Sequence, residues 1–160
     1  MSVGDAWSVL CGIERLSTQV LESRYPAHAG LGEGTVERLL SAQTLVFNES
    51  GIWTLPSGTQ IPFRNRYRWR LEDDALTLAH LRYGDVNPVM LASFVPTAPN
   101  QLRARAPHWC DPDTYQVAMS LCSGGATLLW NVSGPAKDYR MRTVYGCNAR
   151  PASDMGEVLA

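Results

Sequence analysis

Residues 63–71 read Phe-Arg-Asn-Arg-Tyr-Arg-Trp-Arg-Leu. Aromatic and apolar side chains alternate with arginines along this stretch, and Asn65 is the one polar member of the aromatic set. A period of two residues is the pattern of a strand with one face buried and the other in water. The stretch therefore predicts a β-strand whose aromatic face packs against a protein core.

Similar patterns continue on both sides of this strand and are separated by turn residues such as Glu49-Ser50-Gly51 and Glu72-Asp73-Asp74. The segments with strand patterns are 13–22, 35–39, 43–48, 52–55, 76–81, 89–95, 102–106, 115–122, 128–133 and 138–146. Short, evenly spaced antiparallel strands close into a barrel or stack as a sandwich. A meander favours the barrel, because closure leaves no unpaired strand edge. We expect an all-β fold, an antiparallel up-and-down barrel of about eight to ten strands.

The two remaining parts of the N-terminal region do not have a strand pattern. Asp5 can N-cap a short helix that ends at Gly12. Residues 25–34 are rich in glycine and read as a loop. A single domain is expected over residues 1–147, followed by a C-terminal tail over residues 148–160 without a clear pattern.

Composition excludes several classes of function. The net charge of −1 gives no bulk attraction to nucleic acid or to an anionic membrane, and no long apolar run predicts a transmembrane helix. The four cysteines form no Cys-x-x-Cys pair and the three histidines are scattered, so we expect neither a metal site nor a cofactor. Reduced thiols in a cytoplasmic protein are the default expectation, but spacing alone does not exclude a disulfide. A homodimer is also left open.

Two motifs near the C-terminus carry a family resemblance. They are His-x-Cys-x-x-Asp-x-Tyr at 108–115 and Trp-x-Val-x-Gly-Pro-x-Lys-Asp-Tyr at 130–139. With these motifs, about residues 7–146 resemble an uncharacterised family of small lipocalin-like (calycin) barrels. The resemblance implies a barrel around a ligand cavity. It implies no reaction, because fold does not fix function.

The first motif admits two interpretations. His108 and Cys110 share one face of a strand, so the imidazole could activate the thiol as a nucleophile. Alternatively Pro107 and Pro112 mark a structured corner, in which Cys110 packs as a small apolar residue.

Lys137 is the one lysine of the chain. Desolvation would depress its pKa and prepare it for Schiff-base or general-base chemistry, whereas a position on a solvated hairpin tip would leave it an ordinary cation. Tyr115, Tyr139 and Tyr145 could donate hydrogen bonds to a ligand or form the barrel wall.

The arginines of residues 63–71 also have two interpretations. They are solvated if the aromatic face packs the core. If instead the barrel interior is polar, one or two of them bind an anionic ligand.

These observations predict a protein that binds a small, largely apolar ligand inside the barrel and holds its carboxylate or carbonyl group with arginine and tyrosine side chains. The candidate ligand-binding residues are Arg66, Arg68, Tyr67, Trp69, Trp130 and Cys110. The alternative is a cofactor-free cyclase, isomerase or lyase on the same barrel. Its candidate catalytic residues are His80, His108, Tyr115, Lys137 and Tyr139.

A third alternative is a structural or interaction module with a filled barrel. Polar side chains that converge at the base of a cavity would favour catalysis.

Overall fold

The computed structural model describes residues 2–24 and 29–146, and in these ranges the chain forms one short helix and eleven strands. The elements are α1 (Val3–Leu10), β1 (Arg15–Ser23), β2 (Leu31–Ser41), β3 (Thr44–Thr54), β4 (Gln60–Leu71), β5 (Leu76–His80), β6 (Val89–Ala98), β7 (Gln101–Ala104), β8 (His108–Cys110), β9 (Asp113–Cys122), β10 (Gly125–Ser133) and β11 (Asp138–Gly146).

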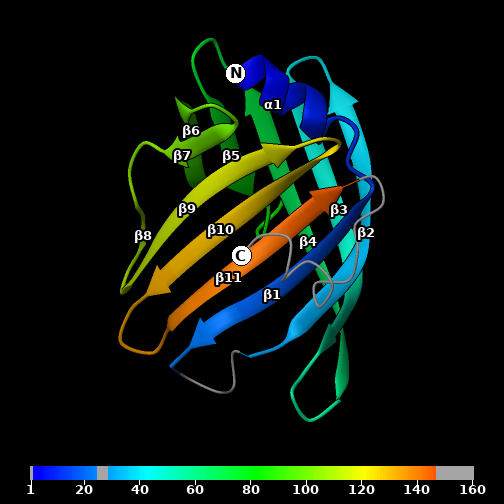
Figure 1. The fold of residues 1–160 in the computed structure, drawn as a ribbon, viewed down its shortest axis with the longest axis vertical. Coiled ribbons are helices and arrows are strands. Elements are labelled where there is room, and N and C mark those ends of the chain that lie inside the picture. Colours follow the sequence, from blue (N-terminus) through cyan, green and yellow to red (C-terminus); the bar gives the residue numbers. More distant parts are fainter. Residues whose placement is uncertain (1, 25–28, 147–160) are drawn as a thin grey trace.

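The strands form a closed up-and-down barrel (Figure 1). Neighbours along the chain pair antiparallel, except for β7 and β8, which both pair with β9. Strand β11 returns to pair with β1, which closes the ring. The ring has ten strand positions, because β7 and β8 share one edge of β9: β7 faces residues 118–120 and β8 faces residues 113–115. The predicted all-β barrel with a short N-terminal helix is confirmed.

The alternation of aromatic residues and arginines along residues 63–71 sets the orientation of β4. Its odd-numbered side chains point into the barrel, where Trp69 is fully buried and packs edge-on against Phe47 of β3, with ring centroids 6.1 Å apart. The arginines lie on the outer face. There Arg66 donates a hydrogen bond from Nε to Asn48 Oδ1 at 2.9 Å and forms an ion pair with Asp85.

Helix α1 lies across one end of the barrel (Figure 1) and buries Val3, Ala6 and Leu10 against the core. The prediction that Asp5 is the N-cap of this helix is wrong, because the helix begins three residues earlier. Ser2 is the N-cap, and Asp5 at the third helical position completes a capping box by accepting a hydrogen bond from the backbone N–H of Ser2. Both side chains satisfy backbone donors that a helix start otherwise leaves unpaired.

Two predicted breaks are instead parts of strands. Residues 43–48 and 52–55 belong to one strand, β3, which runs without a break through Glu49-Ser50-Gly51. The glycine-rich stretch is already part of β2 from Leu31 onward. Here β2 and β3 approach closely: a Cβ on Gly34 would lie 2.2 Å from the carbonyl oxygen of Ser50. Glycine is required at this position because a side chain would push the strands apart.

The expected tail, 148–160, and part of the expected loop, 25–28, lie outside the described residues, as does Cys147. The cysteines at 11, 110 and 122 are free thiols. In the described ranges the structure contains no helix with the length and apolar character of a transmembrane span.

Candidate functional site

The barrel interior has two parts. The inward side chains nearest α1, including Leu45, Phe47, Trp69 and Phe94, pack into a continuous core. Further along the strands the interior opens into a cavity of about 410 Å³. This volume lies within the range of small-molecule sites in proteins, which is about 300–1,000 Å³.

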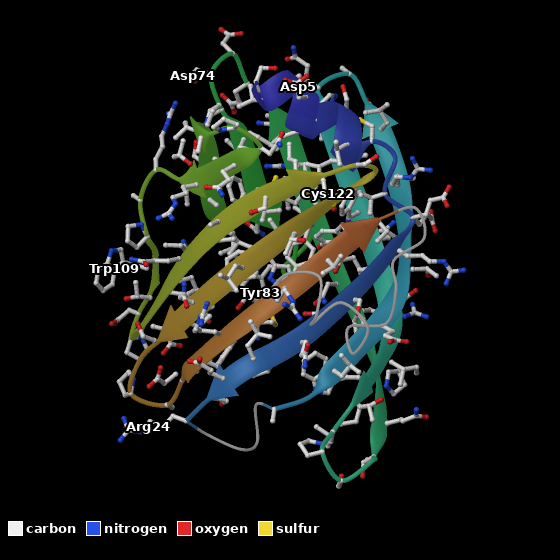
Figure 2. The ribbon with its side chains drawn as sticks, in the orientation of Figure 1. Asp5, Arg24, Asp74, Tyr83, Trp109 and Cys122 are labelled. Carbon is white, nitrogen blue, oxygen red and sulfur yellow. The ribbon has the colours of Figure 1, made fainter. Side chains whose placement is uncertain are left out.

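Most of the cavity wall is apolar. Phe63, Leu91, Trp130 and Met141 line it from four different strands. Such a surface is suited to the hydrocarbon part of a small molecule, because burial of apolar surface contributes about 25 cal/mol per Å². Tyr83 and Arg82 also border the cavity; Tyr83, labelled in Figure 2, is 64% exposed, and the guanidinium carbon of Arg82 lies 5.5 Å from its ring centroid.

Glu49 is the main polar feature of the cavity. It follows Leu45 and Phe47 as the next inward-facing residue of β3 and is only 4% exposed. Tyr145 of β11 donates a hydrogen bond from its hydroxyl to Glu49 Oε2. Burial raises the pKa of the Glu49 carboxyl to about 7, and the hydrogen bond from Tyr145 opposes that rise in part. Near neutral pH the carboxyl is therefore able both to accept and to donate a proton.

Further polar groups surround this carboxyl. Asn65 lies directly opposite Glu49 on β4, and Tyr67, the next inward residue of β4, stacks on His80 of β5 at 4.8 Å between ring centroids. Burial and the nearby Glu49 raise the pKa of the Tyr67 hydroxyl, so it stays protonated and able to donate a hydrogen bond. Burial and Arg82 lower the pKa of His80, which favours its neutral imidazole.

The residues of the two sequence motifs lie toward another part of the same cavity. His108, Cys110, Tyr115 and Tyr139 all line it, and the ring centroids of His108 and Tyr115 are 5.9 Å apart. Burial raises the pKa of Tyr139, which favours its protonated phenol. Trp109 lies between His108 and Cys110 in the sequence. Its side chain is exposed and points away from the barrel (Figure 2).

Lys137 does not line the cavity, but it contacts Tyr115, which does. Its Nζ donates a hydrogen bond to the Tyr115 hydroxyl at 3.0 Å and lies 3.4 Å from Asp113 Oδ2. The hydrogen bond to Tyr115 is the main reason that the pKa of Lys137 is raised. The depressed pKa that Schiff-base chemistry requires is therefore absent, and Lys137 is a cation that positions Tyr115.

The structure thus brings together most of the candidate residues, but not all of them. His80, Tyr67 and Trp130 line the cavity with the motif residues. Arg66 and Arg68 lie on the outer face of β4 and do not reach the cavity, and Trp69 belongs to the core beneath α1. The phase of the alternation explains the outward position of the two arginines, because odd-numbered residues of β4 face inward. Trp69 also faces inward, but it lies in the packed part of the interior rather than in the cavity wall.

Sequence reasoning missed Glu49. It interpreted Glu49-Ser50-Gly51 as a turn, since serine and glycine are common in turns. The available signal was an acidic residue in phase with the apolar residues Leu45 and Phe47. Among the described residues, no group of three or more histidine, cysteine, aspartate or glutamate side chains is placed to hold a metal ion.

Comparison with protein families gives one result. The model of a family of unknown function, DUF6314, matches residues 10–147, which is most of the chain. No curated protein matches the sequence.

Proposed function

Because the chain belongs to DUF6314, a family of unknown function, we propose a function from the cavity itself: the barrel binds one small, largely apolar molecule. The observation that carries the proposal is the cavity of about 410 Å³, whose apolar wall meets a single buried carboxyl, Glu49. An apolar enclosure with a few convergent polar groups is the usual form of a ligand site.

The polar groups narrow the class of ligand. A second carboxylate beside Glu49 would be unfavourable, because two like charges in one buried site repel each other. A carbonyl oxygen has no such cost, and it accepts a hydrogen bond from the protonated Glu49 carboxyl or from the Tyr67 hydroxyl. A carbonyl group facing Glu49 is therefore preferred over a carboxylate there, and an anionic group of the ligand belongs near Arg82.

The lipocalin-like relationship suggested by the two motifs is part of the same proposal. An up-and-down barrel with an open internal cavity agrees with ligand carriage, because larger barrels of this architecture enclose ligand cavities, whereas small ones are filled by side chains.

Fluorescence titration with N-phenyl-1-naphthylamine, a neutral apolar probe, tests the proposal. We expect saturable binding of one probe per chain. Met141→Trp adds bulk inside the cavity, so it weakens probe binding by at least about tenfold, or about 1.4 kcal/mol. Met90→Trp is the matched control, because Met90 is 47% exposed and does not line the cavity. Equal probe affinities of both variants would place the binding site outside the barrel and refute the proposal.

A further inference from the structure

We propose that the bound molecule is an unsaturated carbonyl compound and that Glu49 transfers a proton between two of its carbon atoms, which makes the barrel a cofactor-independent isomerase. The proposal rests on the proposed function, since the substrate must first bind in the cavity. It assigns the acid–base role to Glu49, which the two sequence motifs do not contain.

Position is the first argument. Among the described residues that line the cavity, Glu49 carries the one carboxyl group. It is held on the middle of a long strand, β3, and is anchored by the hydrogen bond from Tyr145. The strand and the hydrogen bond fix the orientation of the Glu49 carboxyl before the substrate binds. A preorganised base is well placed for proton transfer, because no entropy is lost in orienting it during the reaction.

Electrostatics is the second argument. The inward neighbours of Glu49 on β2, Gly34 and Val36, carry no charge. The other ionisable groups that line the cavity come from β4, β5, the loop after β5, β8, β9 and β11. They are Tyr67, His80, Arg82, Tyr83, His108, Cys110, Tyr115, Tyr139 and Tyr145. Near neutral pH the buried phenols of Tyr67, Tyr139 and Tyr145 are protonated, because their pKa values are raised, and the lowered pKa of His80 favours its neutral imidazole. Arg82 lies in an exposed segment. No salt bridge of the described residues involves Glu49, which keeps its proton affinity close to the value suited to acid–base catalysis at neutral pH.

A partner for the substrate oxygen is the third argument. Tyr145 already donates its proton to Glu49. The Tyr67 hydroxyl makes no hydrogen bond to another residue of the described ranges, although its ring is fixed by stacking on His80. This protonated hydroxyl is therefore available to a ligand oxygen in the same cavity.

The reaction needs no further reagent. In a β,γ-unsaturated ketone the Glu49 carboxylate removes a proton from the carbon between the carbonyl and the double bond. The electron pair of that C–H bond forms a dienolate, and its oxygen takes the negative charge and accepts a hydrogen bond from Tyr67. Glu49 then returns the proton to the γ carbon while the electron pair of the enolate restores the carbonyl. The product is the α,β-unsaturated isomer, so atoms and electrons balance.

The first half of this reaction can be measured with 2-tetralone, an apolar bicyclic ketone, in D₂O. We expect the protein to exchange the protons next to the carbonyl for deuterium, as followed by proton NMR. Glu49→Gln lowers the protein-dependent rate by at least about 100-fold, which is the usual contribution of a general base. Tyr67→Phe lowers it by about 100-fold, as for the loss of one donor to an enolate oxygen. Glu33→Gln, which changes an exposed glutamate of β2, leaves the rate unchanged.

Binding is measured in the same samples by displacement of N-phenyl-1-naphthylamine. Displacement by 2-tetralone without Glu49-dependent exchange would overturn the isomerase and leave the binding function standing. A protein that binds neither compound would overturn both. For the wild type we also expect the exchange rate to rise with pH and level off near the Glu49 pKa of about 7; a rate that does not change between pH 5 and 9 would contradict the assignment without any variant.

Discussion

Replacing Glu49 by glutamine should stabilise the protein, and the gain should depend on pH. In the unfolded chain a glutamate has its ordinary pKa of 4.5, whereas burial raises the pKa of Glu49 in the folded protein to about 7. Below pH 4.5 the carboxyl is protonated in both the folded and the unfolded protein, so its ionisation does not change the free energy of unfolding. Between these two values only the folded state holds it, and stability therefore falls as pH rises. Above about pH 7 the carboxyl is ionised in both states, and the free energy of unfolding falls no further through this group.

The size of the loss follows from the two pKa values. Each pKa unit between the folded and unfolded states corresponds to about 1.4 kcal/mol, so the difference between 4.5 and about 7 amounts to about 3 kcal/mol. Glutamine keeps the acceptor for the Tyr145 hydroxyl and never ionises. For a domain of this size we therefore expect the melting temperature of Glu49→Gln to exceed that of the wild type by about 6–12 °C at pH 8.5 and to match it within a few degrees at pH 4.5.

Thermal or urea unfolding at several pH values between 4.5 and 9 measures this difference. Glu33→Gln serves as the control, because it makes the same chemical change on the exposed face of β2. Comparing each variant with the wild type at the same pH cancels the contributions of His80 and the other titrating groups. A Glu49→Gln curve parallel to the wild-type curve would refute the reasoning, since it would mean that the folded protein holds Glu49 at its ordinary pKa.

Three further substitutions test other parts of the structure. Gly34→Ala should lower the free energy of unfolding by more than about 2 kcal/mol, because the added methyl group collides with the backbone of β3. Gly4→Ala in α1 should instead raise the free energy of unfolding by about 0.5 kcal/mol. Urea denaturation compares the two variants, and equal effects would contradict the close approach of β2 and β3. Ser2→Ala removes the cap of α1 and should cost about 1 kcal/mol, while an unchanged melting temperature would show that the cap contributes nothing. Lys137→Met should cost less than about 1 kcal/mol by urea denaturation, because its contacts with Tyr115 are partly exposed to water; a loss of several kcal/mol would instead mark a buried ion pair.

Alternation made most of the barrel predictable from the sequence. The pattern of residues 63–71 identified β4 and the turn that follows it, and similar patterns identified most of the other strands. The phase of this pattern also distinguished the two faces of β4, although it did not by itself show which face was the interior. Where a strand contained turn residues, as β3 does at Glu49-Ser50-Gly51, local reasoning broke one strand into two.

The candidate site was less predictable because its central contact is not local. Glu49 and Tyr145 are 96 positions apart and meet only after the barrel closes. Three residues of the first sequence motif, His108, Cys110 and Tyr115, do line the cavity, but the carboxyl that the cavity encloses comes from β3. Burial rather than sequence spacing is what sets the pKa of Glu49, and burial follows from the complete fold.

The most direct test of the ligand-binding function is a crystal structure of the wild-type protein with N-phenyl-1-naphthylamine. We predict that the probe lies inside the barrel, with its rings between Phe63 and Trp130 and its N–H directed to the Glu49 carboxyl. A probe bound to the outer face, for example at the exposed Trp109, with the cavity left to water, would contradict the account.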